Sequence, residues 1–540
     1  EEVGGGGAMG PFLPNVMDAL CRVLQDDDAE VITAASHCAA ALGASSQGPA
    51  LLELVVPRIR GEGAGMDTPQ NRTAGLLLLT AALGGEVGQG GGASYAMKRA
   101  VAEGEVVGAS ETVLAPAALR LSEALAEPGL MMMEDLTLTE ALLDACTAMI
   151  KRAPAACSSL REFGSAGEEE FGAAAHTCSR LVRALVQIQG NAEVAPFNDA
   201  ELSLAEDALA AVEEIGKAAG VADVSVVYSD HLDPIMDMLM ALGEGEGEGD
   251  ESMLSSSTPQ LRAFDALMRR VSSSEVAGLS GPHLERLVPI IVRHAKQGRS
   301  GAMEAIATDA ELQLSMLAIL ETLLSAPGNE QYWPSHTPVL LQEVLVGNMV
   351  WKAGRVASTV RKVAVACFYS LLHNGYADKP VLFAIAPHVL PILKTDLDDY
   401  DASTRQLVCI SLKLMFEALP GAMSDQPVQE LYPSLLKRLD DSSDEVRYAV
   451  CQTFKAFFLA APPAAFRGTV IDYTLDQLLV HLDDQDPAIQ GLLFEVIQNC
   501  IPIDAPRVAK KAAAVRSAHR SPKYVDELVR MANEHGGAAP

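Results

Sequence analysis

Aromatic residues are scarce in this sequence. They make up 5% of its 540 residues, although hydrophobic residues as a whole make up 49%. Tyr, Trp and Phe favour β-strands, so their scarcity argues against a large β protein. The apolar residues are instead rich in Ala, Leu and Val, a mixture that suits closely packed helices. The composition therefore predicts an all-α fold.

Cations are also scarce relative to acids. The chain has 40 Lys and Arg against 71 Asp and Glu, which gives a formal net charge of −31. Affinity for DNA or RNA comes largely from cations that neutralise phosphates, so this balance argues against nucleic-acid binding as the main task. We expect basic protein partners or a crowded cytosol instead.

The sequence lacks a disulfide framework, a membrane span and a secretory signal. Its nine cysteines form no CxxC pair, which is typical of buried thiols in a reducing compartment and predicts a cytoplasmic location. The strongest apolar run, Ala74 to Leu83, is far shorter than the ~18 to 20 residues that span a bilayer, so we expect a soluble protein. The first residues, Glu1-Glu2-Val3 and four glycines, resemble no signal peptide, and the missing Met indicates a fragment.

No familiar catalytic or metal-binding pattern occurs. The chain has no His-Glu-x-x-His, no Gly-x-Ser-x-Gly and no Gly-x-x-x-x-Gly-Lys-Ser/Thr. His176 and Cys178 are two residues apart on an expected helix, where they would point to different faces, so a metal site is not expected there. The sequence therefore predicts a protein that is not an enzyme and has no cofactor or metal.

The tripeptide Leu-Asp-Asp recurs at a fixed period. It occupies residues 397–399, 439–441 and 482–484, with separations of 42 and 43 residues. A period of about 40 to 47 residues is the signature of HEAT or armadillo repeats. Such units are antiparallel helical hairpins that bury their apolar stripes only by stacking. We therefore predict an α-solenoid of HEAT/armadillo-type hairpins.

The residues after each tripeptide predict where the second helix begins. Four positions beyond the leucine stand Asp401, Ser443 and Asp486, which can accept hydrogen bonds from the first N–H groups of a helix. Eight positions beyond it, two of the three units have an arginine, which we expect to pair with an aspartate of its own or the next turn. The residues predicted to have this structural role are Asp399, Arg405, Asp441, Ser443, Arg447, Asp484 and Asp486.

Composition divides the chain into four parts. Residues 1–92 are expected to form N-terminal hairpins that end in a Gly-rich loop, and 93–242 degenerate helical repeats. Residues 243–257 read as an acidic Gly/Glu/Ser-rich linker, and 258–540 as a C-terminal HEAT array. The array ends in a basic segment, where residues 505–535 have seven Lys and Arg against three Asp and Glu.

One basic stretch is a candidate partner-binding surface. Residues 351–362 have four cations and one of only two tryptophans, which are residue types enriched at interface hot spots. Trp351, Lys352 and Arg355 are the candidate contact residues. The alternative is that Trp351 packs over the end of its hairpin while Arg361 is the turn arginine of that unit. For Arg361 we favour the turn role; for Trp351 and Arg355 both interpretations stay open.

Four segments of the last third are detailed enough to compare with known families. They are Trp351-x-Ala353-Gly354-Arg355 with Val365-Ala366-Cys367, Leu431-Tyr432-Pro433-x-Leu435-Leu436-Lys437-Arg438-Leu439-Asp440-Asp441, Leu478-Leu479-Val480-His481-Leu482-Asp483-Asp484 and His519-Arg520-Ser521-x-x-Tyr524. Together they resemble the HEAT-repeat dynein axonemal assembly factors of the factor 5 family.

The resemblance implies a cytoplasmic, non-enzymatic scaffold for preassembly of the outer and inner dynein arms of motile cilia. Its implied partners are axonemal dynein heavy or intermediate chains, with chaperones or other assembly factors. An alternative is a generic HEAT-repeat adaptor, such as a nuclear-transport-type cargo binder, which the acidic charge would permit. A tubulin-binding array would need basic turns, whereas these turns contain paired aspartates.

Overall fold

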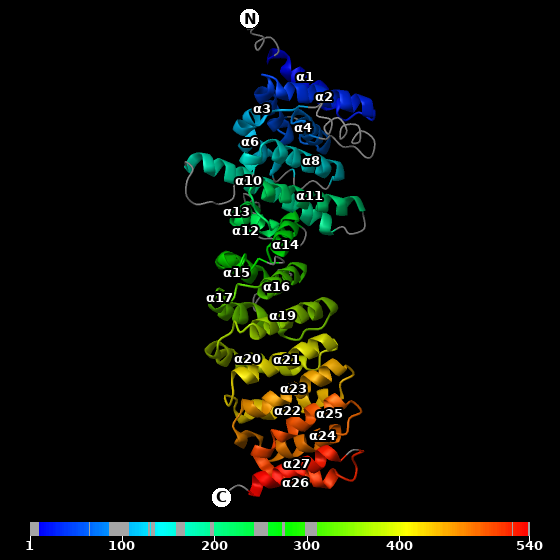
Figure 1. Ribbon diagram of the computed structural model, residues 1–540, viewed down its shortest axis with the longest axis vertical. Coiled ribbons are helices and arrows are strands. Elements are labelled where there is room, and N and C mark those ends of the chain that lie inside the picture. The colour runs from blue at the N-terminus through cyan, green and yellow to red at the C-terminus, as the bar shows by residue number, and fades with distance from the viewer. Residues whose placement is uncertain are drawn as a thin grey trace, which may run out of the picture. The chain divides into compact units, whose positions relative to one another are not determined.

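The computed structural model describes residues 10–63, 65–85, 107–127, 130, 135–157, 168–194, 199–241, 258–272, 276–296, 310–520 and 522–537. Every regular element in these ranges is helical, and none is a strand. The chain divides into two compact units, residues 1–283 and 284–540. Each unit is a stack of antiparallel helical hairpins (Figure 1), so the predicted all-α solenoid architecture is confirmed.

The second unit consists of hairpins with one helix in each of two layers. The first helices are α15 (Leu284–Ala295), the run of α17 (Trp333–Val339), a π-helical turn (Leu340–Leu345) and α18 (Val346–Met349), α20 (Lys379–Asp396), α22 (Asp425–Lys437), α24 (Thr469–His481) and α26 (Ile501–Val515). The second helices are α16 (Ala310–Ser325), α19 (Arg355–His373), α21 (Ala402–Ala418), α23 (Asp444–Ala460), α25 (Pro487–Gln498) and α27 (Lys523–Gly537).

Within this unit each helix packs on its counterpart in the next hairpin. The second helices α16, α19, α21, α23 and α25 contact one another in sequence, and the first helices α18, α20, α22, α24 and α26 do the same. The apolar stripes that the sequence predicts on α22 and α23 are buried, with Val428, Leu435, Val446 and Phe454 each at 0% exposure. The core is therefore a continuous seam between two layers of helices.

The first unit repeats the pattern with less regular hairpins. Its main helices are α1 (Leu13–Val23), α2 (Ala29–Ala44), α3 (Gly48–Ile59), α4 (Pro69–Ala82), α6 (Glu111–Leu125), α8 (Leu136–Arg152), α10 (Glu168–Val194), α11 (Asp199–Ala218), α12 (Val224–Asp230), α13 (Leu232–Ala241) and α14 (Pro259–Ser272). Helices α2, α4, α8 and α11 contact one another in order, as do α3, α6 and α10. Helix α14 packs on α10 and α12, within the same unit.

The expected linker at 243–257 and most of the Gly-rich stretch at 84–92 lie outside the described residues. The four-part division of the chain therefore stays a proposal. Among the described residues, no single helix is long and apolar enough to cross a membrane; α2 and α3 pass that test only as a pair, which is bent by 119°.

Helix α26 of the basic C-terminal segment packs onto α24, the first helix of the preceding hairpin. Arg507 and Lys511 of α26 bind Asp472 of α24 at 2.8 and 3.1 Å, and Lys511 also binds Asp476 at 2.6 Å. These ion pairs join the last hairpin to its neighbour. The reversed charge of this segment therefore complements α24 within the fold.

The helix starts follow from the residues that the repeat places there. Asp401, Ser443 and Asp486 are in the extended conformation, and their side chains accept hydrogen bonds from Thr404, Val446 and Ala488 N–H, respectively. Each bond satisfies one of the four N–H groups that a helix start leaves without an intrahelical acceptor. The caps thus determine where the second helices α21, α23 and α25 begin.

Two adjacent serines allow a matched test of a cap. Ser443→Ala removes the acceptor at the start of α23 and should lower the free energy of unfolding by about 0.5 to 2 kcal/mol. Ser442→Ala changes an exposed neighbour and should stay within about 0.5 kcal/mol of the parent. Thermal and denaturant melts of the full chain would measure both. Equal stability of the two variants would show that Ser443 is not a working cap.

Candidate functional site

Three turns of the second unit, those that contain Leu-Asp-Asp, share one hydrogen-bond pattern. The second aspartate of each Leu-Asp-Asp accepts a bond from the backbone N–H of the cap residue two positions on. These N–H···O distances are 2.9 Å at Asp399, 3.1 Å at Asp441 and 2.8 Å at Asp484. Each carboxylate therefore closes its own turn with one oxygen and leaves acceptor capacity for another donor.

That other donor is the arginine of the preceding hairpin. Arg405 Nε and Nη2 donate to the two carboxylate oxygens of Asp441 at 2.8 and 2.6 Å. The same guanidinium donates from Nη1 to the Asp399 carbonyl of its own turn at 2.8 Å. Burial raises the pKa of Asp441, but the hydrogen bonds from Arg405 and the Ser443 N–H together lower it by more than burial raises it. The pKa of Asp441 therefore lies below its usual value. One side chain thus joins two successive turns.

The pattern recurs on both sides of this pair. Arg361, which is 0% exposed, binds Asp399 through Nε at 2.7 Å and through Nη2, and Arg447 binds Asp484. We call these three contacts the arginine ladder: Arg361–Asp399, Arg405–Asp441 and Arg447–Asp484. The predicted turn residues therefore lie within one connected network, and Arg361 has the turn role that the sequence favours for it.

The ladder ends at the last hairpins. Gln490 stands where the earlier units have arginine, and its Nε2 donates to the Asp484 carbonyl of its own turn at 2.6 Å. Arg520, from the turn between α26 and α27, donates through Nε to Asp483 at 3.0 Å and through Nη2 to its carbonyl at 2.6 Å. The contact direction is reversed here, because the later turn supplies the arginine to the earlier one.

Arg72 of the first unit is a related residue that the repeat pattern did not identify. Its side chain is almost wholly buried, and Nη1 donates to the Ile59 carbonyl at 3.3 Å and to Glu127 at 3.2 Å. It stands four positions beyond the cap residue Thr68, as Arg405 stands four beyond Asp401. The signal was present as this cap-to-arginine spacing, without the Leu-Asp-Asp tripeptide that marks the later units.

Asp396, at the end of α20, is a buried carboxyl beside the ladder. It is 0% exposed, neither oxygen has a hydrogen-bond partner, and the nearest cation is Arg361 Nε at 3.8 Å. Burial raises the pKa of Asp396 to about 7, outweighing the lowering effect of Arg361. The group therefore favours its protonated form in the folded protein below about pH 7.

The candidate partner-binding residues lie in an exposed loop between α18 and α19. Every residue from Val350 to Val356 is exposed. We call this segment, the five connecting residues together with the first two residues of α19, the α18–α19 loop. Trp351 is 49% exposed, whereas Trp333 is fully buried and stacks on Tyr376. The two tryptophans thus have opposite environments. The interpretation of Trp351 as a partner contact fits this exposure and remains a proposal.

The ladder also holds the backbone of this loop. Arg361 Nη1 donates to the Lys352 carbonyl at 3.3 Å while the rest of the guanidinium is bound to Asp399. Gly354 then opens α19 with a φ of +115°, a conformation that glycine adopts without strain, and no side chain caps this helix start. The exposed side chains of Lys352 and Arg355 are therefore presented by an anchored backbone.

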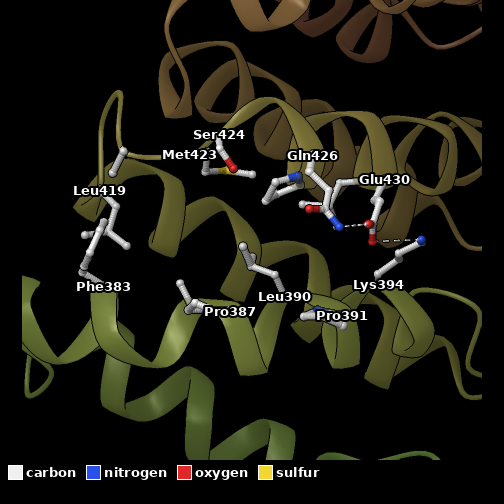
Figure 2. Close-up of a pocket in the computed structure, with 14 residues that line it drawn as sticks. Phe383, Pro387, Leu390, Pro391, Lys394, Leu419, Met423, Ser424, Gln426 and Glu430 are labelled. Carbon is white, nitrogen blue, oxygen red and sulfur yellow. Dashed lines mark hydrogen bonds and ion pairs between the residues drawn. The ribbon is translucent and has the colours of Figure 1, made fainter.

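A separate apolar groove lies between α20 and α22. It has a volume of about 510 Å³ and is walled by one face of α20, the loop after α21 and the start of α22. Figure 2 shows Phe383, Pro387, Leu390 and Pro391 along one wall, and the chain of contacts from Gln426 through Glu430 to Lys394 at one end. Between the next two first helices, α22 and α24, lies Phe466, from the loop before α24. It is fully buried among Phe457 and Phe458.

One arrangement in the first unit has the residue types of a catalytic triad. His283 Nδ1 lies 3.0 Å from Asp233 and its Nε2 lies 3.5 Å from the Ser229 hydroxyl. That hydroxyl donates to the Leu279 carbonyl at 3.0 Å, and Ser229 is 7% exposed. A nucleophile needs its proton directed to the base and access to substrate, so this cluster joins helix ends rather than forming an active site.

The stacked hairpins and their arginine ladder define a HEAT-type helical repeat protein. The HEAT repeat family model matches residues 431–459, from the second half of α22 to the last turn of α23. Similar curated proteins are Dynein axonemal assembly factor 5 of Homo sapiens, 23% identical over 62% of this chain and 36% of that protein, and of Xenopus laevis, 25% identical over 62% and 38%. The resemblance inferred from the four segments is thereby confirmed.

The match to this chain covers little more than a third of the full length of these curated relatives. Among solved structures, Kap121p covers 92% of this chain and 48% of its own, with a TM-score of 0.41 and 12% identity. That likeness is too distant to support an inference, so it gives the cargo-binder alternative no support.

Asp396 predicts a specific dependence of stability on pH. Because its pKa is raised from 3.8 in the folded protein, the folded state holds this proton more tightly than the unfolded state, so this group lowers stability as pH rises from about 4 to about 7. Asp396→Asn removes that effect. The free energy of unfolding of the variant, relative to the parent, should rise across this window in denaturant melts. A difference that stays constant with pH would contradict the assignment.

Proposed function

We propose that this chain is a non-enzymatic scaffold that holds components of axonemal dynein arms while they are assembled in the cytoplasm. The observation that carries the proposal is its similarity, over 62% of its length, to proteins named Dynein axonemal assembly factor 5. The partners would be axonemal dynein heavy or intermediate chains, acting with chaperones or other assembly factors. The protein's own turns and helix faces would supply the contacts.

The architecture is consistent with holding a large client. Stacked hairpins expose long helix faces and turn edges, and each repeat contacts mainly its neighbours, so a broad surface is available without a closed core. The arginine ladder keeps successive turns in register along the second unit. A rigid edge of this kind loses less conformational entropy when a partner binds.

The described residues favour holding over catalysis. The serine–histidine–aspartate cluster of the first unit is enclosed, and the described residues contain no group of three or more His, Cys, Asp and Glu placed to hold a metal ion. The cysteine thiols at 409, 451 and 500 are buried, and burial raises the pKa of Cys409 and Cys451 to about 12. A thiol in that state is a poor nucleophile.

Deletion of the gene in an organism with motile cilia tests this function. Cells without the protein should build cilia of roughly normal length that lack outer and inner dynein arms, because the client would stay unassembled. Dynein heavy and intermediate chains should be depleted or retained in the cell body. Electron microscopy of axonemes and immunoblots of the separated fractions would measure both effects.

Re-expression of the intact gene should restore both rows of arms, and the protein itself should remain in the cell body. Deletion cells with both rows of arms intact would contradict the proposal. Protein found stably in the axoneme would point to a structural component instead of an assembly factor.

A further inference from the structure

We propose that the α18–α19 loop, residues 350–356, is the docking site for an acidic segment of a protein partner. In this arrangement carboxylates of the segment lie against Lys352 and Arg355, and one of its apolar side chains packs on Trp351. The inference rests on the proposed function, since it assigns the chemistry of a segment that a scaffolded client presents.

The loop exposes apolar surface that the fold leaves uncovered. Val350 is 42% exposed, Trp351 49% and Val356 50%, so three sizeable apolar side chains lie in water within one short loop. Trp and Arg are the residue types most enriched where interfaces gain their affinity. Trp351 combines a large apolar area with an indole N–H that can donate to a partner's carboxylate or carbonyl.

The charge of the loop is opposite to that of the chain. Residues 350–356 have two cations and no acid, and residues 357–362 of α19 add two more cations, in a protein with a net charge of −31. Arg361 is bound to Asp399, and Lys362 lies 3.2 Å from Asp401. The side chains of Lys352 and Arg355 are exposed on the loop. An acidic segment would be repelled by most of the surface and attracted here, which favours one docking position.

The loop is fixed before a partner arrives. The buried guanidinium of Arg361 bonds the Lys352 carbonyl, and nothing lies within 4 Å of the place where a Cβ on Gly354 would project. The loop backbone is therefore anchored at the Lys352 carbonyl, and the space beside Gly354 is open. Binding to a preorganised loop avoids much of the ordering cost that a mobile loop would add.

A nucleic acid is the competing polyanion, and the observations favour a peptide. The exposed cations in the loop are two, whereas nucleic-acid affinity grows with the number of phosphates neutralised. The acidic remainder of the chain would repel a long phosphate backbone but tolerates a short acidic segment. The apolar side chains beside the cations also suit a peptide that alternates acidic and apolar residues.

A synthetic peptide provides a direct test. The probe is a fluorescein-labelled peptide Glu-Glu-Leu-Glu-Glu-Phe-Glu-Glu, titrated with the full 540-residue chain while fluorescence anisotropy is recorded. We expect saturable binding that weakens between about 50 and 200 mM salt, as screening predicts. Arg355→Glu and Trp351→Ala should each weaken binding about tenfold or more.

Matched controls separate the loop from charge in general. Lys379→Glu reverses an exposed cation at the start of α20 and should leave binding unchanged. The same peptide with every Glu replaced by Gln should not bind. Bound peptide should also protect Trp351 from acrylamide quenching, and the milder Trp351→Phe variant should lose this signal while the emission of buried Trp333 persists.

Three results would overturn the docking site. They are no binding of the acidic peptide, equal binding by the parent and a folded Arg355→Glu or Trp351→Ala variant, and tighter binding of a single-stranded oligonucleotide that the peptide fails to displace. None of these affects the deletion result. Loss of dynein arms in deletion cells without peptide binding would support the assembly function and reject this site. Peptide binding with intact arms would support the docking site and reject the assembly function.

Discussion

The contact between an arginine of one hairpin and a turn aspartate of the next is the interaction on which the second unit depends. A turn that joins two buried helices leaves backbone N–H and carbonyl groups with no helical partner. Asp441 accepts the N–H of its own turn, while Arg405 satisfies both that carboxylate and a carbonyl of the preceding turn. Guanidinium suits this position because its planar fork can donate in several directions at once.

This chain of contacts also links the fold to the proposed function. At the N-terminal end of the ladder, Arg361 Nη1 binds the Lys352 carbonyl and so fixes the α18–α19 loop. The same atom of Arg405 binds the Asp399 carbonyl. The connection from α18 to α19, residues 350–354, has five residues, as has the Asp-rich turn 397–401, so a greater length predicted from the sequence is wrong and does not explain the exposure of this loop. A buried structural pair and an exposed cationic loop are thus two parts of one arrangement.

The architecture of the second unit could be predicted because it is encoded locally. The Leu-Asp-Asp tripeptide, the cap four positions after its leucine, as at Ser443, and the arginine eight positions after its leucine, as at Arg405, lie within one short stretch of sequence that then recurs. Arg72 was missed because its carboxylate partners, Asp67 and Glu127, do not belong to a Leu-Asp-Asp tripeptide. The groove beside Phe383 and the opposite environments of Trp333 and Trp351 could not be predicted, since they depend on which side chains neighbouring hairpins bring to the same place.

A double-mutant cycle on Arg405 and Asp441 tests the central claim most directly. Free energies of unfolding of the parent, Arg405→Ala, Asp441→Ala and the double variant give the coupling between two hairpins. A working ladder contact should give a coupling of about 1 to 3 kcal/mol. The same cycle with Asp440, the exposed first aspartate of that turn, in place of Asp441 should give almost none. Equal coupling in both cycles, or none in either, would contradict the account.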